Sequence, residues 1–284
     1  MTTRGLVGLM TLLALGACSA GPSNGDSAAE PSGAAAEDAE PAGVVALGHS
    51  GITGEGATPE RSEWRRYSWA TGDAPEVNSI YTRMIQLHPE TKGNVANTGA
   101  PSGPSSALEA QARAALLQVP TPRLAIIQSI DAGIRCDGTD AEHVSTFGKN
   151  LAAALDVFTS ESPDSAILVM DQPGRPTAAA AYFPPGPPAE DVATDPCGLI
   201  DQQGRFIAEK AQALTDIIEG YEDEQERVCA QYPQCHDDDN ARRDFDDHVA
   251  GMLSPDGNHL AAAGQAKMAE LTWPTVENIL AESN

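Results

Sequence analysis

A serine at a glycine-flanked turn is the first residue in this sequence whose type and position suit covalent chemistry. Ser50 follows the short apolar run at residues 44–47 and lies in the tetrapeptide Gly48-His49-Ser50-Gly51. Glycines permit sharp turns and close approach of a substrate, so a turn here can present the hydroxyl in a cleft. The second glycine comes one position too early for the G-x-S-x-G elbow of α/β-hydrolases. Ser50 is therefore a candidate nucleophile, and the alternative is a serine that only caps the following helix.

A histidine and an aspartate near the C-terminus supply the complementary chemistry. Asp256 and His259 lie three positions apart in the segment Leu-Ser-Pro-Asp-Gly-Asn-His-Leu at residues 253–260, ahead of an alanine-rich helix predicted at 261–271. At this spacing the carboxylate can orient one ring nitrogen while the other faces outward. His259 is therefore a candidate general base with Asp256 as its partner. The alternative is an aspartate that caps the helix beside a surface histidine.

Short apolar segments that alternate with helical patterns must bring these residues together. Strands are predicted at residues 44–47, 93–99, 124–127 and 166–170, and helices at 77–87, 104–117, 140–158 and 199–228. This alternation predicts a mostly parallel sheet covered on both faces. A site would then lie at the carboxyl ends of the strands, where Ser50, Gly99 and the loop at Asp131 gather.

Three segments together resemble the SGNH (GDSL) hydrolases over most of residues 43–280. They are Gly-x-Ser after the first strand, residues 94–100 with Gly99 after the second strand, and Asp-Gly-x-His-Leu-x-x-x-Gly before the last helix. The resemblance implies a three-layer α/β/α sandwich with a mostly parallel central sheet (SGNH/flavodoxin-like). It also implies ester hydrolysis by Ser50, His259 and Asp256, with the N–H groups of Ser50 and Gly99 in the oxyanion hole and no metal or organic cofactor.

The sequence departs from the family pattern at two positions. The family's Gly-Asp-Ser is Gly48-His49-Ser50 here, and Ile130 stands where the third family block carries an asparagine that completes the oxyanion hole. Loss of one such donor costs about 3 to 4 kcal/mol of transition-state stabilisation. Either Asn97 or a backbone amide of the Gly133 loop replaces it, or the enzyme is slow. An Ile130→Asn substitution is accordingly expected to raise kcat.

These features support three functional hypotheses. The first is a serine esterase that hydrolyses a carboxylic ester through an acyl-enzyme intermediate. The second, motivated by Ile130, is a degenerate domain that binds an envelope glycan or lipid without turnover. The third is acyl transfer to a sugar by the same residues. The expected partner is a small-molecule, glycan or lipid ester, and the protein is expected to be a monomer.

The composition excludes some classes of partner. The chain has 284 residues, is 41% hydrophobic and carries a formal charge of -24 from 41 acidic and 17 basic residues. Such a charge opposes binding to nucleic acid or to an anionic membrane surface. The acidic run at residues 236–247 lacks the glycine and terminal glutamate of an EF-hand, which favours a solvated acidic surface over a calcium site.

The N-terminal segment indicates export. Residues 1–18 combine Arg4, an apolar run and Leu15-Gly16-Ala17-Cys18, which resembles the lipobox of bacterial lipoproteins with Cys18 lipidated. An ordinary signal peptide with a chance cysteine is the alternative. Residues 19–42 have a tether composition, and residues 43–284 form the predicted hydrolase-like domain. These features predict a lipid-anchored protein on the extracytoplasmic side of the cell membrane.

The remaining cysteines agree with an oxidising compartment. Cys136, Cys197, Cys229 and Cys235 are even in number, and three pairings are possible. The short spacing between Cys229 and Cys235 favours a local disulfide, which leaves Cys136 with Cys197. A zinc site of all four cysteines is the competing interpretation, but the paired C-x-x-C spacing is missing.

Overall fold

The computed structural model describes residues 41–181, 197–243, 245, 251–256 and 258–282. The predicted signal peptide and lipidation site, residues 1–18, lie outside the described residues, as does the predicted tether apart from residues 41 and 42. The strands are β1 (Val44–Gly48), β2 (Val95–Asn97), β3 (Leu124–Gln128), β4 (Ala166–Val169) and β5 (Cys235–Asp237). The α-helices are α1 (Ser50–Thr53), α2 (Ile80–Leu87), α3 (Leu108–Gln118), α4 (Asp140–Glu161), α5 (Ala208–Cys229) and α6 (Ala262–Glu282).

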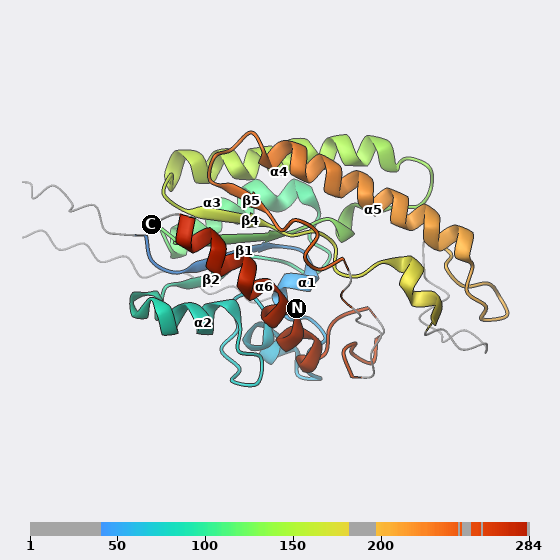
Figure 1. Cartoon of the computed structure of the whole chain (residues 1–284), viewed down its shortest axis with the longest axis horizontal. Coiled ribbons are helices and arrows are strands. Elements are labelled where there is room, and N and C mark those ends of the chain that lie inside the picture. The colour runs from blue at the N-terminus through green and yellow to red at the C-terminus, as the bar shows by residue number, and fades with distance from the viewer. Residues whose placement is uncertain (1–40, 182–196, 244, 246–250, 257, 283–284) are drawn as a thin grey trace, which may run out of the picture. The chain divides into compact units, whose positions relative to one another are not determined.

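The five strands form one sheet in the order β2-β1-β3-β4-β5, and every neighbouring pair is parallel. Right-handed crossovers through helices allow such a sheet to be covered on both faces. Figure 1 shows the strands in the middle layer between helices above and below. The predicted three-layer α/β/α sandwich is therefore confirmed.

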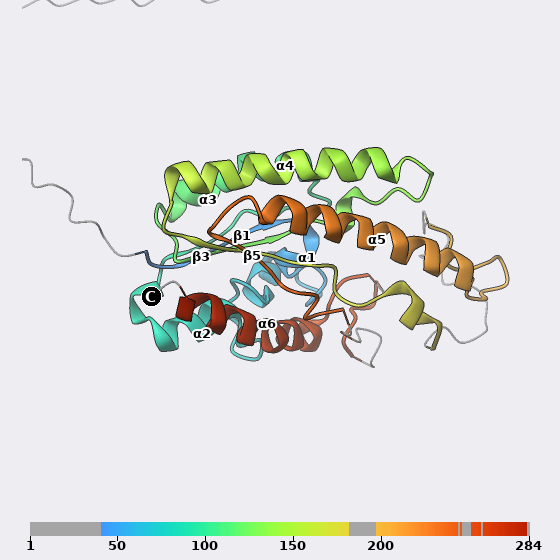
Figure 2. The ribbon, with the colours of Figure 1, turned by 45° about the horizontal axis from the view of Figure 1, so that its top comes forward.

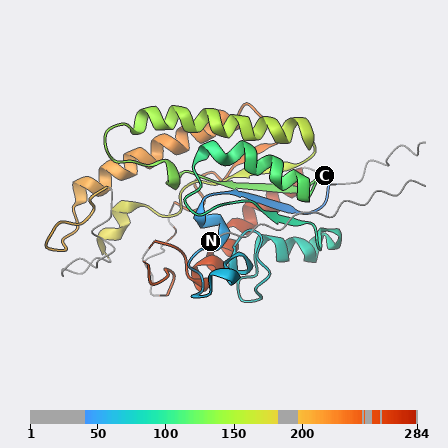
Figure 3. The same ribbon diagram turned by 180° about the vertical axis from the view of Figure 1, so that it is seen from behind.

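Each face of the sheet has its own hydrophobic core, because successive strand residues point to opposite sides. Figure 2 shows α3, α4 and α5 on one face of the sheet and α2 with α6 on the other, and Figure 3 shows the same layers from behind. From β1, Val45 and Leu47 pack in the core that includes residues of α3, α4 and α5. Val44 and Ala46 pack in the core that includes residues of α2 and α6.

Two helix boundaries differ from the prediction by more than two helical turns, and the others differ by four residues or fewer. The helix predicted at 199–228 begins only at Ala208, because Asp201 accepts the N–H groups of Gln203 and Arg205 and so closes a turn. The last helix, predicted to end at 271, continues through Pro274 to Glu282. Its final turns are retained because they carry further buried residues, Val276, Ile279 and Leu280.

The prediction of a solvated acidic surface at 236–247 agrees with the exposure of residues 239–241 and 243 but is wrong for Asp238 and Arg242, which are buried. Residues 235–237 form β5, a strand too short and too polar to be found from apolar patterning. Asp238 and Arg242 follow it, and both side chains are fully buried as an ion pair. A buried charge requires a charged or hydrogen-bonded partner, and each of these residues supplies it to the other.

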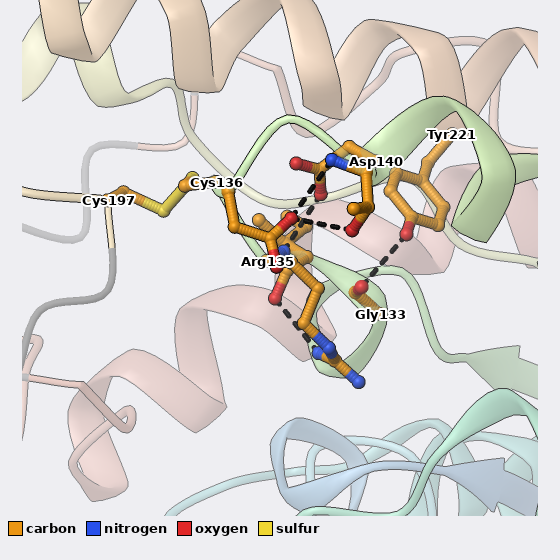
Figure 4. The surroundings of a disulfide bond; sticks show 9 residues. Gly133, Arg135, Cys136, Asp140, Cys197 and Tyr221 are labelled. Atoms are coloured by element: carbon orange, nitrogen blue, oxygen red, sulfur yellow. Dashed lines mark hydrogen bonds between the residues drawn. A yellow bond between two sulfur atoms is a disulfide. The ribbon is translucent and has the colours of Figure 1, made fainter.

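Two disulfide bonds join the cysteine pairs that the spacing favoured. Cys229–Cys235 links the end of α5 to β5, and Cys136–Cys197 links the loop after β3 to the segment before α5. Figure 4 shows the second bond together with the Tyr221 hydroxyl, which donates to the Gly133 carbonyl at 2.9 Å. The loop after β3 is thus attached both to the segment before α5 and to α5 itself. Because all four thiols are oxidised, they do not form a zinc site.

Among the helices of the described residues, none combines the length and apolar character that a membrane span requires.

Candidate active site

The turn that carries Ser50 depends on Gly48. Gly48 pairs with Gln128 across β1 and β3 and has a φ of 133°, a backbone region that L-residues with side chains rarely adopt. A Cβ on Gly48 would lie 1.7 Å from the Gln128 carbonyl oxygen. Any other residue would force the two strand ends apart. Glycine therefore lets the chain turn directly off the sheet so that Ser50 begins α1.

His49 explains the first departure from the family pattern. It is the N-cap of α1, and its ring Nδ1 accepts the N–H of Gly51 at 3.1 Å. A side-chain acceptor at the N-cap satisfies one of the free N–H groups in the first helical turn. Aspartate is a usual N-cap residue, so His49 makes the same kind of capping hydrogen bond that an aspartate at this position could make. The turn around Ser50 is retained with a different cap.

Asp256 and His259 form the hydrogen-bonded pair that the sequence predicted. The distance from His259 Nδ1 to Asp256 Oδ2 is 2.8 Å, and the other carboxylate oxygen accepts the His259 N–H at 2.9 Å. Ser254 donates its hydroxyl to the same oxygen at 2.6 Å. The Ser254 N–H donates to the His259 carbonyl at 2.8 Å, which closes the loop around the carboxylate. This arrangement places the Nδ1 proton toward Asp256 and leaves Nε2 to accept a proton.

The environment of Asp256 favours its ionised form. Partial burial acts to raise the pKa of Asp256, but hydrogen bonds from Ser254, His259 and Asn258 outweigh burial and hold that pKa well below its usual range. A carboxylate that stays ionised can orient the imidazole and stabilise the imidazolium formed when His259 takes a proton.

Ser50 and His259 line one cleft with two lobes, and together with His49 and Asn258 they border both lobes. The Glu55 lobe has a volume of about 260 Å³ and is also lined by Glu55, Ser102 and Ala132. The Gln128 lobe, about 60 Å³, is also lined by Gly51, Gln128, Gln172, Pro173 and Leu260. The fold therefore brings the predicted nucleophile and the predicted base to the same cavity, although they come from opposite ends of the described chain.

The predicted oxyanion-hole groups other than Ser50 are engaged elsewhere. The Gly99 N–H donates to Asn97 Oδ1 at 3.2 Å, and the Asn97 side-chain N–H groups donate to Ile52 O and Thr71 Oγ1, each at 2.8 Å. The Gly133 N–H donates to the Ile130 carbonyl at 3.1 Å. Asn97 and the Gly133 amide therefore hold loops together and do not replace the absent asparagine.

Ile130 does not point into the cleft. Its side chain is 1% exposed and packs in the core beneath α3, α4 and α5. The expectation that Ile130→Asn places an amide in the oxyanion hole was therefore wrong. The Ile130 side chain lies in one core, whereas Gln128 is hydrogen-bonded to Trp69, a residue of the core on the other face of the sheet.

Gln128 is a cleft donor that the sequence interpretation missed. The Trp69 indole N–H donates to Gln128 Oε1 at 3.2 Å. An indole N–H can only donate, so the amide oxygen must face Trp69 and the amide NH₂ must face the other way. A Cβ on Gly51 would lie 2.9 Å from Gln128 Nε2, so the missing side chain of Gly51 makes room for this amide. The glutamine thus offers N–H groups to the lobe that Ser50 and His259 border.

Glu55 is the second missed residue. Its carboxylate lies 4.0 Å from His259 Nε2, on the side of the ring opposite Asp256, and its side chain is 14% exposed. Gly54 and Gly56 flank it with φ values of 77° and 78°. A Cβ on Gly56 would lie 2.7 Å from the His259 Cβ, so this loop packs directly against His259. In the sequence, the position of Glu55 between two glycines was the signal that could have identified it as a site residue.

One acidic cluster in the described part of the chain has a geometry compatible with a metal ion. Carboxylate oxygens of Asp171, Asp237 and Asp238 lie within 4.8 Å of one another. Protein groups already neutralise or bridge them, since Arg242 pairs with Asp238 and the Gln225 amide donates to Asp171 at 3.1 Å. Burial and the neighbouring Asp171 raise the pKa of Asp237 to about 6. We interpret the cluster as a structural network that attaches β5 to β4.

Comparisons with known proteins identify relatives by fold alone. No family model and no curated protein sequence matches this chain. A lipase from a goat rumen metagenome has a TM-score of 0.54 and 16% identity over 82% of this chain and 96% of the lipase. An extracellular lipase from Streptomyces rimosus has a TM-score of 0.50 and 16% identity over 84% and 99% of the two chains. A salicylyl-acyltransferase from a tetracycline biosynthetic pathway has a TM-score of 0.50 and 13% identity over 86% and 56%. These similarities concern the fold, which this chain shares with two lipases and an acyltransferase.

Proposed function

We propose that this SGNH-fold protein is a serine hydrolase that cleaves carboxylic esters through an acyl-enzyme. The observation that carries the proposal is the cleft in which Ser50 meets the hydrogen-bonded pair of His259 and Asp256. Fold alone does not carry function, so the geometry of these side chains is the argument. A nucleophile, a base and a carboxylate that orients the base are the parts that acyl transfer requires.

In the proposed reaction Ser50 attacks the ester carbonyl carbon. The Oγ–C bond forms as the hydroxyl proton passes to His259 Nε2, and Asp256 stabilises the resulting imidazolium. When the tetrahedral intermediate collapses, the bond to the leaving oxygen breaks and the imidazolium gives its proton to that oxygen. Water then repeats the sequence on the acyl-enzyme, which releases a carboxylic acid and restores Ser50.

Hydrogen-bond donors must stabilise the negative oxygen of the intermediate. We assign the Ser50 N–H as one donor, because the first residues of a helix have N–H groups without intrahelical partners. The Gln128 amide is the second assigned donor, since Trp69 holds its NH₂ toward the cleft. Gly99 can contribute only after its N–H leaves Asn97 Oδ1.

The proposed location is the extracytoplasmic side of the cell membrane, with Cys18 as the lipidated residue. The two disulfides of the hydrolase domain are consistent with export, because such bonds persist in oxidising compartments. The lipobox-like segment supports the anchor. In this arrangement the membrane is contacted through the lipid rather than through the acidic protein surface.

A fluorophosphonate probe tests the proposed nucleophile directly. The purified protein should be labelled at Ser50, as identified by peptide mass spectrometry, and should hydrolyse p-nitrophenyl acetate. Ser50→Ala should abolish both signals while the melting temperature stays within about 2 °C, because this small hydroxyl contributes little packing. An unlabelled but folded wild-type protein would support the alternative of a binding domain without turnover. Labelling with turnover only when a sugar acceptor is added would indicate acyl transfer.

A further inference from the structure

Glu55 places a negative charge in the substrate cleft without a permanent protein partner. Its Oε2 atom is buried and has no hydrogen-bond partner among the described residues. The nearest basic group is His259 Nε2 at 4.0 Å, which the proposed reaction uses to exchange protons with Ser50 and the leaving group. A buried carboxylate oxygen without a hydrogen-bond partner is costly, so its presence beside the candidate base indicates a role.

No other charged side chain in the described lining of the cleft balances this carboxylate. Neither lobe is lined by a lysine or arginine among the described residues. Glu55 is therefore the carboxylate that a bound substrate meets, since Asp256 borders neither lobe in that part of the chain and pairs with His259 instead. An anionic substrate would face repulsion in this cleft, whereas a cation would be attracted to a carboxylate oxygen that has no hydrogen-bond partner among the described residues.

The chemistry of the reaction adds to this argument. Attack by Ser50 creates a negative oxygen on the substrate, and the Glu55 carboxylate in the same cleft opposes that charge. A positive group on the substrate placed between the two would reduce the repulsion. The whole chain, with a formal charge of -24, also attracts cations to its surface before they reach the cleft.

We infer that the cleft selects esters that carry a positively charged group close to the ester, with Glu55 as the residue that binds that group. This inference rests on the proposed ester hydrolysis at Ser50 and names its substrate class. The turn formed by Gly54 and Gly56 directs Glu55 into the lobe, and the lobe volume of about 260 Å³ suits a short ester with an ammonium head.

Acetylcholine and its uncharged carbon isostere, 3,3-dimethylbutyl acetate, measure this preference. The two esters share their shape and differ in charge, so the ratio of their kcat/KM values reports the contribution of the cation. We expect the wild-type protein to favour acetylcholine. The quaternary ammonium has no N–H to donate, so the ratio reports Coulombic attraction to Glu55, for which we expect a factor of about 10 or more.

Glu55→Gln keeps the size of the side chain and removes its charge. It should lower the acetylcholine to dimethylbutyl acetate ratio by about 10-fold or more through loss of the Coulombic attraction, mainly through KM for acetylcholine. Glu60→Gln is the matched control, because this exposed glutamate lies five positions further along, borders neither lobe and changes the net charge equally. The control should leave the ratio within about twofold of wild type.

The possible results separate this inference from the proposed function. If both esters are hydrolysed with equal kcat/KM and Glu55→Gln slows both by the same factor, Glu55 only stabilises the His259 imidazolium and the substrate assignment is rejected. A ratio that falls equally in Glu60→Gln would also reject it, because long-range attraction would then explain the preference. If neither ester is hydrolysed and the neutral fluorophosphonate does not label Ser50, the proposed function itself has failed.

Discussion

Replacing Ile130 with asparagine should destabilise the protein and should not raise its kcat. Ile130 is 1% exposed in the core on the α3, α4 and α5 face. The substitution removes the burial of an isoleucine side chain, worth about 1.5 to 3 kcal/mol. It also leaves a buried amide without a designed partner, at a further cost of about 1 to 3 kcal/mol.

The sum is about 3 to 6 kcal/mol, which for a domain of this size corresponds to a fall in melting temperature of roughly 10 to 20 °C. Thermal unfolding followed by circular dichroism measures this fall, and kcat for p-nitrophenyl acetate is measured well below both transitions. Ile130→Val is the control, since it keeps an apolar core residue and should cost only about 1 kcal/mol.

We expect kcat of the folded Ile130→Asn protein to stay within about twofold of wild type, because the side chain lies away from Ser50. The opposite result would be a melting temperature close to that of Ile130→Val together with a kcat at least tenfold higher. That result would mean that the side chain of residue 130 points into the cleft and reaches the oxyanion. The packing described for Ile130 would then be incorrect.

Two further predictions concern other parts of the chain. Burial raises the pKa of Asp237 to about 6, so the folded protein holds that proton more tightly than the unfolded chain, and the associated stability is lost as the pH rises from about 4 to 6. Asp237→Asn should therefore raise the melting temperature at pH 8 and leave it unchanged at pH 4. The expected gain at pH 8 is about 3 °C once the pKa shift is discounted for the partial exposure of Asp237. A gain of equal size at both pH values would contradict this linkage. Cys18→Ala should move the protein from the membrane fraction to the medium or leave an uncleaved precursor. Membrane-bound protein of unchanged amount and processed size would argue against lipidation.

The sequence predicted those strands that are marked by an apolar run in their own residues. β1, β3 and β4 are buried on both faces, so they appear as continuous apolar runs between turns. β5 could not be found in this way, because Cys-His-Asp carries no apolar pattern and its place at the sheet edge depends on pairing with β4.

The same limit applies to the site. Ser50 and His259 stand in short motifs, whereas the direction of a side chain in a loop depends on contacts with distant segments. Glu55 faces His259 because Gly54 and Gly56 turn the chain on either side of it. Ile130 faces the core because it packs against residues that are distant in the sequence. Residue types along a sequence do not specify either direction.

The separation of Ser50 and His259 along the chain has a consequence for when activity can arise. Ser50 follows the first strand, and His259 precedes the last helix, so the cleft is assembled only after both segments have folded onto the sheet. A chain still in synthesis, or one crossing a membrane unfolded, holds the serine without its base. In the proposed exported protein, hydrolysis would therefore begin only after folding on the far side, which would protect esters inside the producing cell.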